Sequence, residues 1–131
     1  MCDSAGAVLH YRGNIFASNG TAGENRTVND VEIESYVRGV IPRESPASWA
    51  DRGNGTGINA LKAQAVAARS YGLAQGGGLT NRRYSYAKTC DTTNCQVYGG
   101  TGTRTSATAN IVAIEDWRSD RAVSETAWHH D

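Results

Sequence analysis

The segment INALKAQAVAARSYGLAQ, residues 58–75, is the strongest helix signal in the chain, because it is rich in alanine and three glycines follow and end it. One face of this helix is small and apolar, and it is formed by Leu61, Ala65, Ala68 and Gly72. Small side chains let neighbouring elements approach closely. We therefore expect this helix to lie in the centre of the domain.

Single polar residues interrupt the same helix. Lys62 and Arg69 share one face, and Gln64 and Tyr71 share another. The two cations are suited either to neutralise a carboxylate or hold a substrate oxygen, or simply to reach solvent from a mostly buried helix. For Gln64, which lies among small side chains, a structural hydrogen bond is the first expectation.

A shorter helix is predicted upstream of this segment. Its expected cap is Asn29 or Asp30, and Gly39 and Pro42 are expected to end it. Pro42 should then hold the chain extended just before Glu44. The apolar stripe of this helix has the spacing i, i+3, i+4 and i+7 and consists of Ile33, Tyr36, Val37 and Val40.

Most of the other segments read as strands and turns. In residues 7–28, short apolar stretches are separated by turn-forming residues such as Gly and Asn, which predicts two or three strands. RRYSYAKTC (82–90) and QVYGG (96–100) have the character of short strands on either side of a polar turn. Residues 107–117 fit a helix slightly better than a strand because of their length and alanine content.

These elements predict a single α+β domain over residues 1–131, with short N-terminal strands and a central alanine-rich helix packed on a small mixed sheet. Thirteen basic and thirteen acidic residues give a formal net charge of zero, so no positive field gathers nucleic acid. The sequence contains neither an apolar run long enough to span a membrane nor an export signal at its start.

Glu44 is the first candidate for chemistry, in the sequence IPRESPASW. The prolines on both sides restrict its backbone, which would hold its carboxyl group in one direction. Trp49, five residues later, is an aromatic side chain that could keep water from that carboxyl. Such a group suits general acid catalysis, and the alternative is an ordinary solvated glutamate in a loop.

Cys90 and Cys95 in CDTTNC lie close enough in sequence to act together, whereas Cys2 stands alone. A disulfide, free thiols and a zinc site all remain open for this pair, because zinc needs further ligands and each histidine lies near one end of the chain. No Ser-His-Asp triad and no phosphate-binding glycine loop can be drawn, so these enzyme classes are excluded.

Three ordered motifs, VNDVEIESYVRGVIPRESPASW, ALKAQAVAARSYGLA and CDTTNCQVYGG, together resemble the stage II sporulation protein D/amidase enhancer (SpoIID/LytB) family of bacterial cell-wall proteins. The resemblance runs from about Val28 to Tyr98 and returns at AVSETA, residues 122–127. It implies a lytic transglycosylase that cleaves peptidoglycan between N-acetylmuramic acid and N-acetylglucosamine, preferably in strands stripped of stem peptides. The alternative from the same family is a noncatalytic peptidoglycan-binding module that enhances an amidase.

The resemblance also assigns roles to residues. Glu44 falls on the family's catalytic glutamate in its P-x-E motif. The same resemblance places a helix with polar substrate-binding candidates beside this glutamate, and within it Gln64 and Arg69 would orient groups or stabilise an oxyanion. These candidates are Lys62, Gln64, Arg69 and Tyr71.

The resemblance further implies no obligatory cofactor. Some family members bind zinc with this cysteine loop and a histidine, but Asn94 stands at the histidine position here. The implied partners are peptidoglycan glycan strands and a cell-wall amidase, and the implied location is extracytoplasmic, at the cell wall or cell surface. Family members continue beyond the SETA motif, so we expect the C-terminal part of the family domain to be missing after residue 127, and enzymatic competence to depend on what that part supplies.

Overall fold

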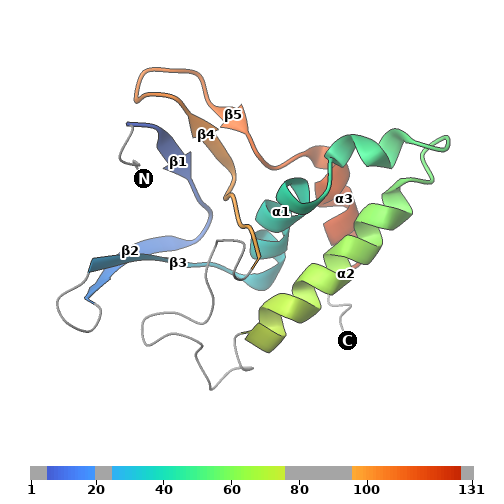
Figure 1. The fold of residues 1–131 in the computed structure, drawn as a ribbon, viewed down its shortest axis with the longest axis horizontal. Coiled ribbons are helices and arrows are strands. Elements are labelled where there is room, and N and C mark those ends of the chain that lie inside the picture. The colour runs from blue at the N-terminus through green and yellow to red at the C-terminus, as the bar shows by residue number, and fades with distance from the viewer. Residues whose placement is uncertain (1–5, 20–24, 76–95, 128–131) are drawn as a thin grey trace.

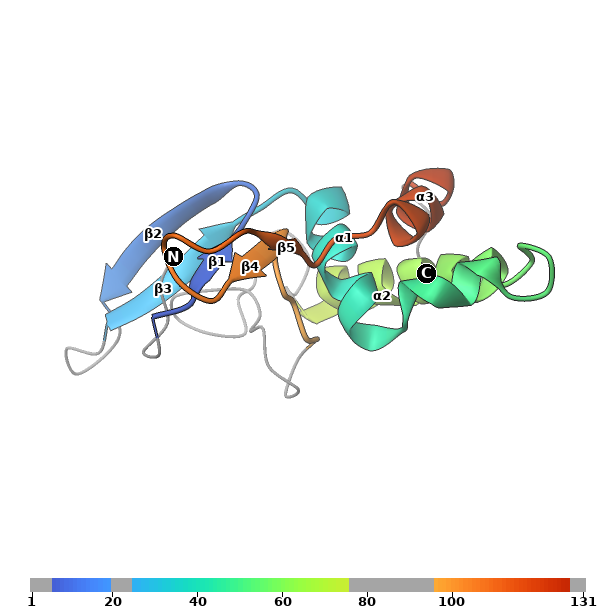
Figure 2. The same cartoon turned by 90° about the horizontal axis from the view of Figure 1, so that it is seen from above.

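The computed structural model describes residues 6–19, 25–75 and 96–127, and these form an α+β fold, as the sequence predicts. Figures 1 and 2 show the helices gathered on one side of the molecule and the strands on the other. In chain order the elements are β1 (Val8–His10), β2 (Asn14–Asn19), β3 (Asn25–Asp30), α1 (Ile33–Glu44), the 3-10 helix η2 (Ala47–Asp51), α2 (Ile58–Gln75), β4 (Gly102–Arg104), β5 (Val112–Ala113) and α3 (Trp117–Glu125). Within the described residues, no helix combines the length and the apolar character needed to cross a membrane.

The hydrophobic core lies mainly in the helical half. It draws on α1, η2, α2 and α3, and Tyr98 from the segment before β4 joins it. Aliphatic and tyrosine side chains build this core, which agrees with a sequence that has one Phe and one Met. Its buried members are Tyr36, Val37, Val40, Ile41, Ala50, Ile58, Leu61, Ala65, Ala68, Tyr98, Ala122 and Val123.

Helix α2 has the bounds that the sequence predicts, residues 58–75. Leu61, Ala65 and Ala68 on its small face are at most 1% exposed. The prediction that it packs on a small mixed sheet was wrong, because α2 packs against α1, α3 and η2, and the described strand pairs are all antiparallel. Gly72 explains part of this preference: its missing side chain makes room for the ring of Tyr36 from α1.

The strands form two small antiparallel sheets. In one, the order is β1-β4-β5, so β1 near the start of the chain pairs with β4 more than ninety residues later. In the other, β2 and β3 form a ribbon in which Asn14 pairs with Asp30 and Asn19 with Asn25. The predicted β region therefore exists, but it extends to Asp30, which lies in a strand and does not cap a helix.

Helix α1 begins later and ends later than predicted. Its cap is Glu32, whose carboxylate accepts a hydrogen bond from the Glu34 N–H at 2.9 Å. The helix also continues through Pro42 to Glu44, where a stop was expected. Proline inside a helix costs about 3 kcal/mol. Complete burial of three aliphatic side chains of α1, each contributing about 1.5–3 kcal/mol, outweighs that cost; they are Val37, Val40 and Ile41.

The predicted helix over residues 107–117 was wrong. Its centre forms β5, which pairs with β4, and the helix α3 starts only at Trp117. Asp116 sets this start, because its carboxylate accepts a hydrogen bond from the Arg118 N–H at 2.9 Å. Residues 96–100 form no strand either, since they cross α1 instead, and the predicted strand at 82–90 lies outside the described residues.

Candidate functional site

Glu44 is the last residue of α1, and its side chain is exposed. The backbone beneath it is anchored, because the buried Ser45 donates its N–H to the Ile41 carbonyl at 2.9 Å. The Glu44 Oε1 atom accepts a hydrogen bond from the Val97 N–H at 3.4 Å. One carboxylate oxygen is thus directed toward the protein, and the exposed group is open to a ligand from solvent.

The segment 96–100 ties the site to the core. Gln96 is buried, and its amide Nε2 donates to the Ala68 carbonyl at 3.0 Å and to the Tyr36 hydroxyl at 3.3 Å. Three residues further on, the Gly99 N–H donates to the carbonyl of Gly39 at 3.0 Å. The segment therefore joins α2 to α1 and brings the Val97 N–H to Glu44. Sequence reasoning missed this role, because a single glutamine in a short apolar run carries no signal of its partners.

Tyr98 holds the same segment against α1. Its ring centroid lies 5.0 Å from that of Tyr36 and 5.8 Å from that of Tyr11. Its hydroxyl donates to Asn29 Oδ1 at 2.7 Å, and burial raises the pKa of this phenol well above its usual value. Tyr98 is therefore a neutral donor that fixes β3 and the segment together.

Arg69 lies in the interior, with a side chain only 1% exposed. Its Nε and Nη2 atoms donate to the two carboxylate oxygens of Glu34 at 2.7 and 2.8 Å, and Nη2 also donates to the Val123 carbonyl at 3.3 Å. This bidentate pair connects α1 to α2, and the third bond reaches α3. Sequence reasoning did not pair Glu34 with Arg69, because the two residues lie 35 positions apart.

The other polar residues of α2 are partly exposed. The Lys62 Nζ atom lies 3.6 Å from Glu125 Oε1 on α3, while Gln64 and Tyr71 are of intermediate exposure. Among the ion pairs of the described residues, none includes Glu44. The predicted set is thus divided between an interior Arg69 and three side chains that solvent reaches.

Trp49 in η2 lies beside a shallow hollow that Arg52, Gly57 and Ala60 also line. The guanidinium carbon of Arg52 lies 5.7 Å from the indole centroid. Glu44 nevertheless stays exposed, so the shielding expected from Trp49 is not observed.

A disulfide, free thiols and a zinc site were the alternatives for Cys90 and Cys95, and both cysteines lie outside the described residues, as does Asn94. Within the ranges that the structure describes, no group of three His, Cys, Asp or Glu side chains is placed to hold a metal ion.

A carboxyl group with a shifted pKa lies on α3. Burial raises the pKa of Asp120 to about 6, and the charges of Glu115 and Asp116 add to this, while those of Arg38 and Arg12 act against it. The Asp120 Oδ1 atom is buried without a hydrogen-bond partner among the described residues. The ionised form of Asp120 is therefore poorly stabilised in the folded protein.

Asp120→Asn is expected to raise the free energy of unfolding at pH 7 by about 1–2 kcal/mol, a value reduced for partial contact with solvent. Between about pH 4 and 6 the unfolded chain ionises this carboxyl while the folded protein keeps it protonated. The wild type should therefore lose stability as pH rises through that window, and the asparagine variant should not. Urea unfolding at pH 4, 5, 6 and 7 measures the difference, with the exposed Asp30→Asn as control; a gain independent of pH would contradict the raised pKa.

Comparison with known proteins identifies one family. A family model described as "Stage II sporulation protein" (SpoIID) matches residues 21–129. The chain is 41% identical over 73 residues to an uncharacterized protein of Brachyspira hyodysenteriae (strain ATCC 49526 / WA1), a match that covers 56% of this chain and 17% of that protein. It is 44% identical over 64 residues to the amidase enhancer of Bacillus subtilis (strain 168), which covers 49% of this chain and 7% of that protein. The matched region thus spans less than a fifth of either relative, and no solved structure matches the chain.

Proposed function

Since the chain belongs to the stage II sporulation protein (SpoIID) family, we propose that it acts at the bacterial cell wall as a peptidoglycan lytic transglycosylase, with Glu44 as general acid and base. Family membership and the similarity to a protein named amidase enhancer support the cell-wall role. The enzymatic part of the proposal rests on the position of Glu44. Its exposed carboxyl group lies at the end of an anchored helix, and one of its oxygens accepts a hydrogen bond from a backbone N–H.

The proposed reaction needs one carboxyl group. The protonated Glu44 donates its proton to the glycosidic oxygen as the bond from that oxygen to C1 of N-acetylmuramic acid breaks. The C6 hydroxyl of the same muramic acid then attacks C1, and Glu44, now a carboxylate, accepts the hydroxyl proton. The products are a 1,6-anhydro end and a free 4-hydroxyl on N-acetylglucosamine, and Glu44 is again protonated. No water is consumed, so the second carboxylate that hydrolytic glycosidases use is not required.

The residues of α2 take different parts in this proposal. Lys62, Gln64 and Tyr71 are accessible enough to contact a glycan strand. The interior Arg69 acts by position, because its ion pair with Glu34 fixes α1, and therefore Glu44, relative to α2. The partner of the domain in this scheme is the glycan strand of peptidoglycan, and the location is extracytoplasmic.

The test is incubation of the protein with peptidoglycan stripped of stem peptides, followed by mass spectrometry of anhydromuramyl ends. Wild type should release them, and Glu44→Gln should lower the rate by about 10²–10⁴-fold, the usual contribution of a general acid-base group. Asp30→Asn, the same change at an exposed carboxylate of β3, should retain full activity. Equal yields from wild type and Glu44→Gln would exclude the assignment.

The second candidate function is a noncatalytic module that binds peptidoglycan and enhances an amidase, and the match to the Bacillus subtilis amidase enhancer favours it. This module should sediment with cell-wall sacculi and stimulate a cell-wall amidase. Both properties should survive Glu44→Gln unchanged, whereas the transglycosylase loses its product with that substitution.

A further inference from the structure

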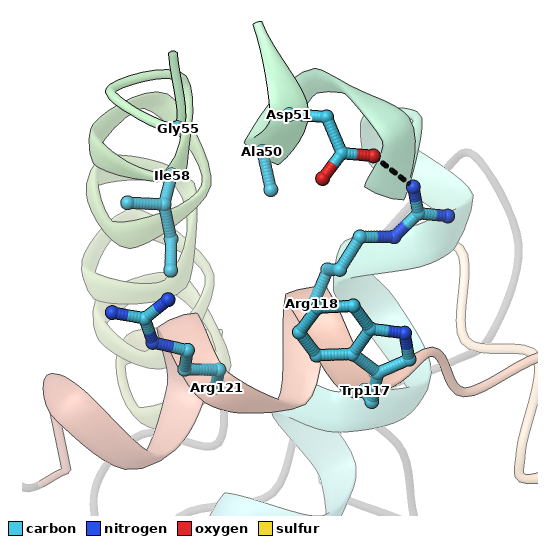
Figure 3. Close-up of a pocket in the computed structure, with 7 residues that line it drawn as sticks. All are labelled: Ala50, Asp51, Gly55, Ile58, Trp117, Arg118 and Arg121. Atoms are coloured by element: carbon cyan, nitrogen blue, oxygen red, sulfur yellow. Dashed lines mark hydrogen bonds and ion pairs between the residues drawn. The ribbon is translucent and has the colours of Figure 1, made fainter.

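A second hollow, of about 100 Å³, lies between η2, the start of α2, and α3 (Figure 3). Ala50 and Ile58 contribute apolar side chains that are only 7% and 8% exposed. Trp117 and Arg121 from α3 also line the hollow. The hollow thus combines apolar surface with an aromatic ring and a cation.

Arg118 holds the two sides of this hollow together. Its Nε and Nη2 atoms each lie 3.0 Å from an oxygen of Asp116, and its Nη1 atom donates to Asp51 of η2, as the dashed line in Figure 3 shows. Because two carboxylates satisfy this guanidinium, Arg118 has a structural role. The spacing between η2 and α3 is therefore set before any ligand arrives.

Trp117 and Arg121 are far more accessible. Trp117 is 70% exposed, the highest value among the large hydrophobic residues in the part of the chain that the structure describes, and the Arg121 side chain is 58% exposed. Arg121 pairs with Glu125 at 2.7 Å, one helical turn away. Such a surface pair contributes only about 0.3–0.5 kcal/mol. An incoming carboxylate can therefore replace Glu125 on Arg121 at little cost. Glu125 also lies 3.6 Å from the Lys62 ammonium, so this group of one acidic and two basic side chains has a net positive charge.

We propose that this hollow binds a sugar ring that carries a carboxylate, with the ring against the Trp117 indole and the carboxylate on the Arg121 guanidinium. The identity of the sugar rests on the proposed function: in a glycan strand of peptidoglycan, N-acetylmuramic acid carries a free lactyl carboxylate once the stem peptide is removed. Ala50 lies six positions after Glu44, so the backbones of these two residues are at most about 22 Å apart. One glycan strand is long enough to occupy both sites.

Binding of single sugars to the full chain tests the hollow without any cleavage. We would titrate the protein with N-acetylmuramic acid and, as the matched sugar without a carboxylate, N-acetylglucosamine, and follow the indole N–H signals by NMR. N-acetylmuramic acid should shift the Trp117 signal and bind more tightly. Arg121→Gln should weaken its affinity about tenfold, the loss expected for a charge-assisted hydrogen bond, and leave N-acetylglucosamine unchanged. Trp117→Ala should weaken both sugars.

Arg52→Gln is the matched control, because Arg52 is an exposed arginine beside the other hollow, and it should bind both sugars as wild type does. The proposal is overturned if N-acetylmuramic acid leaves the Trp117 signal unmoved, or if Arg121→Gln weakens both sugars equally. The proposed function fails or stands by a different measurement, the cleavage of glycan strands by Glu44→Gln. A loss of preference for N-acetylmuramic acid in Arg121→Gln supports the hollow even if Glu44 proves unnecessary for cleavage.

Discussion

Arg69→Met is expected to lower the free energy of unfolding by about 3–5 kcal/mol, because it leaves the carboxylate of Glu34 without its partner in a mostly buried position. The Glu34 side chain is only 12% exposed. The substitution also removes the hydrogen bond that Arg69 Nη2 donates to the Val123 carbonyl. A loss of this size is a large part of the stability of an ordinary domain. Urea unfolding followed by circular dichroism measures it as a lower midpoint at an unchanged slope.

Two further variants show whether the unpaired charge is the cause. Lys62→Met changes a cation on the same helix whose ion pair is partly exposed, so it should cost less than about 1 kcal/mol. The double variant Glu34→Met/Arg69→Met should regain part of the loss, since no unpaired carboxylate remains. If Arg69→Met were no more destabilised than Lys62→Met, the interior ion pair would not be the connection between α1 and α2 that we describe.

Gly39→Ala is expected to destabilise the protein by about 2 kcal/mol, although helix propensity alone predicts a gain of about 1 kcal/mol from this change. A Cβ atom at Gly39 would lie 2.5 Å from Cε1 and 2.8 Å from Cδ1 of the Tyr98 ring, and 3.1 Å from the Gly100 carbonyl oxygen. Tyr98 cannot withdraw easily, because its hydroxyl is bonded to Asn29. The added methyl group must therefore displace the segment that carries the Val97 N–H.

The same substitution should also disturb the candidate site at Glu44. Movement of Val97 would release the oxygen of Glu44 that this N–H holds, so in the proposed enzyme Gly39→Ala should also reduce cleavage at temperatures where it is folded. A double-mutant cycle with Tyr98→Ala checks the cause. If the Tyr98 ring is what the new methyl meets, the double variant should lose less stability than the sum of the single losses. Strict additivity would contradict the contact.

The sequence predicted some parts of the site and missed others for identifiable reasons. Glu44 could be selected because two prolines flank it and because its motif resembles one in a known family. Its actual support, the Val97 N–H, lies 53 positions away and depends on Gln96 being bound to the Ala68 carbonyl. The spacing of residues within one helix or strand cannot indicate a hydrogen-bond partner that lies so far away in the sequence. The substrate-binding roles of Lys62, Gln64 and Tyr71 stay predictions.

Two wrong predictions have the same origin. Pro42 should end a helix by its local chemistry, yet α1 continues to Glu44 because its aliphatic stripe is buried against other elements. Residues 107–117 have the composition of a helix, yet pairing with β4 draws Val112 and Ala113 into a strand, and the Asp116 cap delays the helix. In both segments tertiary contacts outweigh local preferences of about 1–3 kcal/mol.

The sequence by itself determined the central helix at residues 58–75, its small buried face, the α+β class and the position of Glu44, since helix propensity, glycine stops and motif order act within one stretch of chain. Only the tertiary structure decided that Arg69 pairs with Glu34, that residues 96–100 cross α1 and hold Glu44, and that Trp117 and Arg121 share a hollow with η2. These contacts join residues tens of positions apart. Their stability comes from burial and hydrogen bonding between elements, which become defined when the elements pack together.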